Sequence, residues 1–338
     1  AGASPIIGVA LRRRRVSGIL GVVREVTGGG WITDARVAVV AGKGGVGSTT
    51  VAAAMALAAA RDGADVLFVS VDGRPGVGPL LGGAPLTERA AVLCDLSGAG
   101  RVRGRTIPAS GAFADYLELK KVPRLVRRAA SAASLDMIAA ATPGLEHLLV
   151  LGKIKELERT GEADLLIVDA PPAGHAAPFL RSPRALLDVV TDGAVREQAE
   201  EVSAMLADPA RTQGVIVTLP EETPVNEAIE LDRDLRDELH MRMGPLVVNA
   251  CWPDRAGLAV QPRTAAKRQG VSLPTSAASA LAGSVAFGRA RLTQQREQLA
   301  RLDAAIGSSW RVLTRLPVTR ITPEHLRKLA DELTAVAA

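Results

Sequence analysis

Five runs of consecutive apolar residues constrain the fold of this chain more than any other feature of its sequence. Strands that are apolar at successive positions, rather than at alternate ones, are buried on both faces. Segments with helical signals separate these runs, and such alternation favours a parallel sheet with helices on both sides. We therefore expect an α/β fold with a doubly wound, mostly parallel sheet. The expected strands are residues 37–41, 65–72, 164–170, 214–220 and 244–250, with a further strand at 310–317.

Helical signals divide the rest of the chain. Residues 111–160 carry such signals without a strong strand, and we interpret them as a helical subdomain inserted at the carboxyl edge of the sheet. Ser182-Pro183, Thr223-Pro224 and Thr322-Pro323 each predict a helix start, because Ser or Thr caps a first turn in which Pro is tolerated. The other expectations are an irregular segment at 253–287 and a charged helix at 288–306.

Most of the net charge lies in the first residues of the chain. Residues 1–36 contain six Lys/Arg and two acidic residues, a net of +4 out of a total of +5. We predict a flexible basic leader there, ahead of one domain at 37–338. That domain lacks a basic excess and aromatic residues make up only 2% of the chain, which argues against nucleic acid as a partner. Two distant cysteines and four scattered histidines argue against a disulfide framework or a zinc site.

A glycine-rich segment, "AGKGGVGSTT" at 41–50, lies between the first expected strand and an expected helix at 48–62. Gly42, Gly44 and Gly47 satisfy the GxGxxG pattern of dinucleotide-binding loops, and Asp72 ends the next strand, as a ribose-binding acid would. This match is weak when it stands alone, and a dinucleotide-dependent oxidoreductase remains a remote alternative.

The same segment also fits most of the phosphate-loop pattern GxxxxGK[ST]. In such a loop, backbone N–H groups and a helix N-terminus surround phosphates, a lysine adds a point charge, and the next hydroxyl binds magnesium. Thr49 stands at the hydroxyl position, but Ser48 occupies the lysine position. Lys43, directly after the first glycine, is the lysine that remains.

Several motifs together resemble those of the arsenite-pump and tail-anchored-protein-targeting ATPases, which have a deviant phosphate loop. These motifs are "GKGGVGSTT" at 42–50, "VSVDG" at 69–73, "LLIVDAPPAGH" at 165–175 and "PLVVNA" at 245–250. The resemblance extends in order over residues 37–338 and is strongest to actinobacterial anion-transporting ATPase relatives, through "PGLEHLLVLGKIKE" (143–156) and "VTLPEETPVNEAIEL" (217–231). It implies a cytoplasmic dimeric ATPase of the phosphate-loop NTPase class, and association with the membrane surface is compatible with it.

The resemblance also implies roles for individual residues, with ATP and Mg²⁺ as cofactors. Lys43 would act across the dimer interface, and Asp72 would orient the attacking water. Thr49 and Asp169 would serve magnesium, while Asn249 would contact adenine. The residues expected to cradle the phosphates are Gly42, Gly44, Gly45, Val46, Gly47, Ser48, Thr49 and Thr50, and those of the switch segment are Asp169, Pro172, Gly174 and His175.

Departures from the family pattern leave the activity open. Phosphoryl transfer depends mainly on charge neutralisation and positioning, so Ser48 in place of the lysine should slow it by orders of magnitude. The chain is therefore expected to be either an ATPase switch that couples ATP binding and hydrolysis to a protein or membrane-associated client, or a weakened subunit that binds ATP beside an intact paralogue. A homodimer and a heterodimer both remain open. His175 could equally be a structural histidine, and Asn249 a turn residue.

Overall fold

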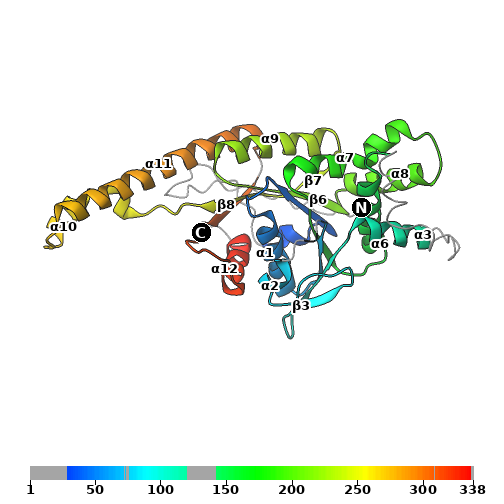
Figure 1. Ribbon diagram of the computed structural model, residues 1–338, viewed down its shortest axis with the longest axis horizontal. Coiled ribbons are helices and arrows are strands. Elements are labelled where there is room, and N and C mark those ends of the chain that lie inside the picture. Colours follow the sequence, from blue (N-terminus) through cyan, green and yellow to red (C-terminus); the bar gives the residue numbers. More distant parts are fainter. Residues whose placement is uncertain (1–28, 72, 74–75, 120–141, 308, 336–338) are drawn as a thin grey trace, which may run out of the picture.

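The computed structural model describes residues 29–71, 73, 76–119, 142–307 and 309–335. The strands are β1 (Val37–Gly42), β2 (Asp65–Ser70), β3 (Ala91–Asp95), β4 (Arg101–Thr106), β5 (Leu165–Asp169), β6 (Thr212–Thr218), β7 (Arg242–Met243), β8 (Leu246–Cys251) and β9 (Trp310–Thr314). Over the described ranges they form one nine-stranded sheet in the order β3-β4-β2-β5-β1-β6-β8-β9, with β7 paired to β6. Only β3 and β4 pair in antiparallel fashion; the other pairs are parallel. The predicted mostly parallel α/β sheet is confirmed (Figure 1).

Helices cover both faces of this sheet. They are η1 (Gly29–Thr33), α1 (Ser48–Arg61), α2 (Val77–Leu80), α3 (Ala109–Leu119), α6 (Leu145–Arg159), α7 (Ala173–Val189), α8 (Ala194–Ala207), α9 (Glu222–Asp237), η2 (Ala256–Ala259), α10 (Pro262–Arg268), α11 (Thr275–Ile306) and α12 (Pro323–Thr334). Alternate residues of β1 point to opposite faces: Val39 packs in the cluster with α6 to α9, and Val40 packs in the cluster with α1 and α12. This alternation is what a sheet buried on both faces requires.

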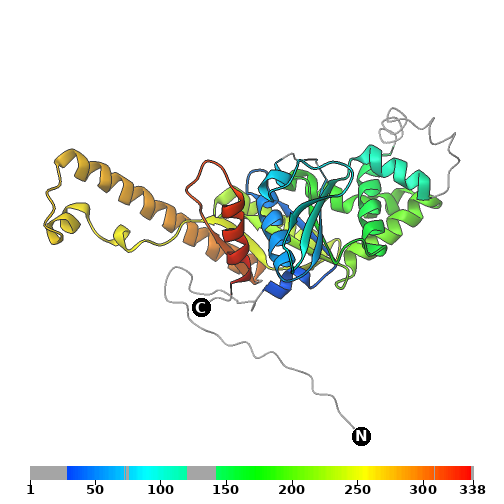
Figure 2. The ribbon, with the colours of Figure 1, turned by 90° about the horizontal axis from the view of Figure 1, so that it is seen from below.

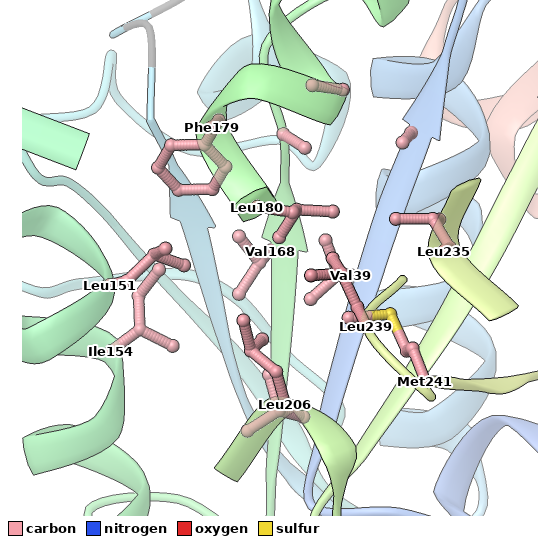
Figure 3. Packing of buried hydrophobic residues seen from close by; sticks show 14 of the residues in the cluster. Val39, Leu151, Ile154, Val168, Phe179, Leu180, Leu206, Leu235, Leu239 and Met241 are labelled. Atoms are coloured by element: carbon pink, nitrogen blue, oxygen red, sulfur yellow. The ribbon is translucent and has the colours of Figure 1, made fainter. Parts of the chain in front are cut away.

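The larger core lies between the sheet and the helices α6 to α9. Val39 of β1 and Val168 of β5 meet side chains from each of these helices and from the segment after α9 (Figure 3). The other side chains of this cluster include Leu151, Ile154, Phe179, Leu180, Leu206, Leu235, Leu239 and Met241, all of which are buried. Because several helices share one apolar cluster with β1 and β5, the carboxyl ends of these two strands are held in a fixed relation.

Three predicted helix boundaries are wrong. Thr223 does not cap α9, because that helix begins at Glu222 and Glu221 is its N-cap. Helix α7 begins at Ala173, so Ser182 and Pro183 lie inside it rather than at its start. The Ser182 hydroxyl donates to the carbonyl of Phe179 at 2.8 Å, a bond back into its own helix. The third boundary concerns residues 253–287, which are not irregular throughout, because η2, α10 and the first turns of α11 form there. By contrast, α12 does begin after Thr322, whose side chain caps it.

Part of the expected leader belongs to the packed body. Trp31 and Ile32 of η1 are 4% and 1% exposed, and the indole of Trp31 donates to the carbonyl of Leu333. Gln213 of β6 donates in turn to the carbonyl of Trp31 at 2.9 Å. The body therefore begins no later than Gly29, and residues 1–28 of the predicted flexible leader lie outside the described residues.

The expected helical insert at 111–160 is described only in part. Helix α6 packs against α7 and α8 and contributes Leu148, Leu151 and Ile154 to the sheet core, so it forms part of the helical layer. Helix α3 packs on α6. Residues 120–141 lie outside the described residues, and a separate helical subdomain there remains a prediction. Of the helices that the structure does describe, none is both long and apolar enough to cross a membrane.

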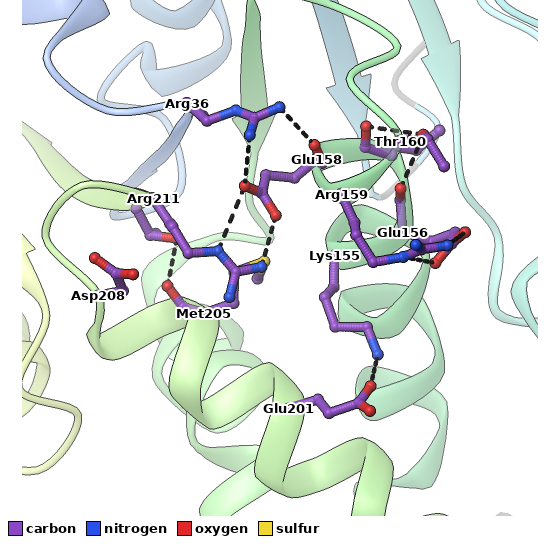
Figure 4. Close-up of polar contacts among 12 residues, drawn as sticks. Arg36, Lys155, Glu156, Glu158, Arg159, Thr160, Glu201, Met205, Asp208 and Arg211 are labelled. Atoms are coloured by element: carbon purple, nitrogen blue, oxygen red, sulfur yellow. Dashed lines mark hydrogen bonds and ion pairs between the residues drawn. The ribbon is translucent and has the colours of Figure 1, made fainter.

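A buried carboxylate ties α6 to the amino-terminal edge of the sheet (Figure 4). The side chain of Glu158 is 3% exposed and accepts hydrogen bonds from Arg211, with 2.6 Å between Nη2 and Oε2. Arg36, just before β1, lies 3.4 Å from the other carboxylate oxygen and also donates to the backbone carbonyl of Glu158. Lys155, one turn earlier, pairs with Glu201 of α8. This network fixes α6 at the edge of the sheet opposite the carboxyl ends of β1 and β5.

Candidate functional site

The segment between β1 and α1 is a tight loop that requires glycine at two points. A side chain at Gly42 would place its Cβ 2.4 Å from the carbonyl oxygen of Val217 in the neighbouring strand β6. Gly47 has φ = +88°, in the left-handed region, and a Cβ there would lie 2.5 Å from the side-chain nitrogen of Asn249. Neither position tolerates a larger residue without rearrangement. The glycine spacing therefore reflects backbone geometry.

The loop encloses a hollow of about 380 Å³ at the amino end of α1. Val46 anchors the loop by inserting into the core, where it is 1% exposed. The glycines Gly44 and Gly45 are exposed, so their backbone is accessible from this side. A helix N-terminus next to an open glycine loop offers N–H groups and positive potential to an anion. The hollow is lined by Lys43, Gly44, Gly45, Gly47, Ser48, Thr49 and Pro172.

Two oxygen-bearing side chains meet at the edge of this hollow. Asp169 ends β5, which lies beside β1, and the residue is 2% exposed. The hydroxyl of Thr49, in the first turn of α1, donates to Asp169 Oδ2 at 2.8 Å. A hydroxyl and a carboxylate are the hard oxygen ligands that Mg²⁺ prefers. These residues are 120 positions apart in sequence, and the fold brings them together as the motifs suggest.

Asn249 braces the loop in this structure. Its side-chain nitrogen donates to the carbonyl of Val46 at 2.8 Å, and its side-chain oxygen accepts from the backbone of Ala250. Ala250 has φ = +53°, which is uncommon for a residue other than glycine. The contact of Asn249 with adenine stays a prediction, and the structure adds a positioning role that its place near the end of β8 did not reveal.

Lys43 has a partner within the same chain. Its ammonium forms an ion pair with the carboxylate of Glu227 in α9, and both side chains are about one third exposed. Glu227 is not among the site residues that the sequence motifs predict. A glutamate in a charged helix gives no sign of such a role, because only the fold shows that α9 passes the loop. The acidic partner keeps the charge of Lys43 beside the hollow it lines.

The remaining predicted residues are placed as follows. Pro172 lines the hollow, while Gly174 and His175 lie exposed in the first turn of α7 rather than in a loop. Thr50 is half-buried in α1, outside the set that lines the hollow. Asp72 lies outside the described residues. Burial raises the pKa of the Cys251 thiol to about 12, so its thiolate is not available near neutral pH.

The phosphate-loop NTPase class of α/β proteins is defined by a mostly parallel sheet and by a glycine loop between a central strand and a helix. An acidic residue ends the strand beside that central strand in the sheet. Sequence comparisons agree. A family model described as "Anion-transporting ATPase" matches residues 35–78. "ATPase BagA" of Mycobacterium tuberculosis is 34% identical over 237 residues, which cover 66% of this chain and 68% of that protein. An "Arsenical pump-driving ATPase" of Escherichia coli is 28% identical over 203 residues, 57% of this chain and 31% of that protein. This chain belongs to the anion-transporting ATPase family.

Proposed function

We propose that this chain binds ATP with Mg²⁺ in the hollow between β1 and α1, as a dimeric nucleotide switch that acts on a protein or membrane-associated client. The observation that carries the proposal is the pairing of Thr49 with Asp169 at the mouth of a glycine loop. Mg²⁺ held by this hydroxyl and carboxylate would neutralise phosphate charge. The loop backbone and the amino end of α1 would orient the phosphates.

A second candidate function follows from the residue at the lysine position. Ser48 begins α1, is 6% exposed and lines the hollow, so the cation that most phosphate loops place there is missing. This favours a subunit that binds ATP and turns it over slowly alone, beside a related subunit with an intact loop. Either function requires ATP to bind, which separates both from a dinucleotide oxidoreductase.

We expect Thr49→Val to abolish the enhancement of ATP binding by Mg²⁺ while leaving the Mg²⁺-free binding in place. Valine keeps the shape of threonine but removes the oxygen that would contact the metal. Titration of a fluorescent ATP analogue, with Mg²⁺ and with EDTA, measures the two affinities. Thr160→Val, at the exposed end of α6, is the matched control and should behave as the wild type. Equal Mg²⁺ dependence in Thr49→Val, or tight NADH binding that ATP does not displace, would contradict the proposal.

We expect Glu227→Gln to tighten ATP binding by up to about fivefold. The substitution removes the carboxylate that neutralises Lys43, and partly exposed ion pairs contribute up to about 1 kcal/mol. The same titration measures the change. In the double variant Lys43→Gln/Glu227→Gln the gain in affinity should disappear. The lysine charge that Glu227→Gln leaves without its partner is then absent. A gain that persists in the double variant would show that Glu227 acts on the nucleotide without Lys43.

A further inference from the structure

A long helical projection extends from one end of the sheet. Residues 255–296, which we call the basic arm, comprise η2, α10 and the first two thirds of α11, and they reach away from the body in both views (Figures 1 and 2). The last turns of α11 return to the body, where Leu299 and Leu302 join the core. The basic arm is therefore anchored at one end and open along most of its length.

The basic arm carries a high positive charge. It contains seven Lys/Arg and no Asp or Glu, whereas the whole chain has a net charge of +5. With residues 1–36 at +4, the rest of the chain therefore has a net charge of −6. Two arginines near the root of the arm approach acids of the body: Arg291 lies 3.6 Å from Glu221, and Arg296 lies 3.5 Å from Asp254.

The charges farther along the arm are not neutralised. Among the described residues, no ion pair is formed by Arg255, Arg263, Lys267, Arg268 or Arg289. All five side chains are exposed. Arg263 and Arg289 contact only oxygens of the arm itself, a hydroxyl of Thr275 and the carbonyl of Leu258. Uncompensated cations on a narrow projection create a positive potential that attracts anionic surfaces.

Large apolar side chains are exposed on the same arm. Val271, Leu281 and Phe287 are 59%, 47% and 54% exposed. They are three of the seven large apolar residues that are exposed in the described part of the chain. Phe287 stands at the inner end of the arm, with the guanidinium of Arg291 over its ring at 5.6 Å. Leu281 lines a groove there, together with Leu258 and Phe287.

We propose that the basic arm docks on an anionic lipid surface. Basic residues near an anionic leaflet attract it strongly, and scattered apolar side chains can enter the headgroup region without a complementary pocket. A protein partner would need such complementarity along the whole arm, whereas Leu281 and Phe287 share one groove and Val271 and the five unpaired cations lie outside its lining, apart from Arg255. Nucleic acid is less suited, because Phe287 is the single aromatic residue between 255 and 296. The arm would thus place the nucleotide-binding domain at a membrane without crossing it.

The test is co-flotation of the full chain with lipid vesicles. We expect binding to vesicles that contain about one third phosphatidylglycerol, little binding to pure phosphatidylcholine, and loss of binding at high salt. Each basic residue near an anionic surface contributes about fivefold in partitioning, so Arg263→Glu/Lys267→Glu/Arg268→Glu should weaken binding by at least about 100-fold. Phe287→Ser should weaken it to a smaller extent without changing the charge.

Two control variants separate the arm from other basic regions. Arg320→Glu/Arg327→Glu/Lys328→Glu reverses three exposed charges near and in α12 and should bind as the wild type. Replacement of Arg12, Arg13, Arg14 and Arg15 by Ser should leave most of the binding in place. The arm variant should keep the wild-type melting temperature and ATP affinity, so its loss of vesicle binding cannot come from misfolding or from the nucleotide site.

Several results would overturn the proposal. They are absence of vesicle binding in the wild type, equal binding to neutral and anionic vesicles, an arm variant that binds like the wild type, and loss of binding in the Arg12–Arg15 variant alone. Tighter binding to a short DNA duplex or to an acidic peptide than to anionic vesicles, at the same salt and lost in the arm variant, would assign the arm to that partner instead.

Discussion

Ser48→Lys is expected to raise the rate of ATP hydrolysis by about 10²–10³-fold over a wild-type chain whose turnover is close to background. Position 48 begins α1 and lines the hollow, so a lysine there would add a positive charge where the side chain is now an uncharged hydroxyl. Single well-placed electrostatic groups in enzyme sites contribute factors of this size. Steady-state release of inorganic phosphate measures the gain.

The same assay tests whether the missing lysine at position 48 limits hydrolysis or whether Lys43 is sufficient. Ser48→Ala should remain at the wild-type level, because it changes the side chain without adding charge. Ser48→Lys should also depend on Thr49, so that Ser48→Lys/Thr49→Val loses most of the gain. Robust turnover in the wild type that disappears in Lys43→Gln would show that serine at position 48 does not slow hydrolysis, and that Lys43 is sufficient.

Arg211→Met is expected to destabilise the protein by about 3 kcal/mol, which lowers the melting temperature by on the order of 5–10 °C. The substitution removes the strongest hydrogen bond to the Glu158 carboxylate, which is 3% exposed and keeps only the longer contact with Arg36. A buried charge that loses its main partner cannot recover its hydration. Thermal and denaturant unfolding measure the loss.

A neighbouring pair supplies the control for this prediction. Arg159 forms a comparable ion pair with Glu156, but its side chain is 63% exposed, so Arg159→Met should cost less than about 1 kcal/mol (Figure 4). The double variant Glu158→Leu/Arg211→Met should recover most of the stability, because no buried carboxylate is left without its partner. If Arg211→Met melts like the wild type, Arg36 alone is sufficient for Glu158.

The central strands could be predicted from sequence because they are apolar on both faces. The outermost strand β3 and its neighbour β4 could not. Strand β4, "RVRGRT", alternates arginines with small or apolar residues, and Val92 of β3 is 52% exposed. Strands that bury one face or less do not differ clearly in composition from a loop. The mixed character of the sheet therefore depends on a pairing that hydropathy alone does not indicate.

Helix α11 was predicted only from residue 288 onward for a related reason. Its first half, rich in Ala, Ser and Gly, has no apolar stripe because it packs on little of the body. At the site, local motifs identified Thr49 and Asp169, since each follows or ends a recognisable strand. The contacts of Lys43 with Glu227 and of Asn249 with Val46 join segments about 200 residues apart, and only the folded chain shows them.

The basic arm forms part of the connection between β8 and β9. These strands are parallel neighbours, with Leu246 opposite Trp310, so the chain between them has to cross from one end of the sheet to the other. Such a crossover needs little more than a dozen residues, usually in one helix. The last turns of α11 already satisfy that need. Most of the basic arm is thus a detour that the sheet does not require, so the strand order that holds the glycine loop does not depend on the arm's length.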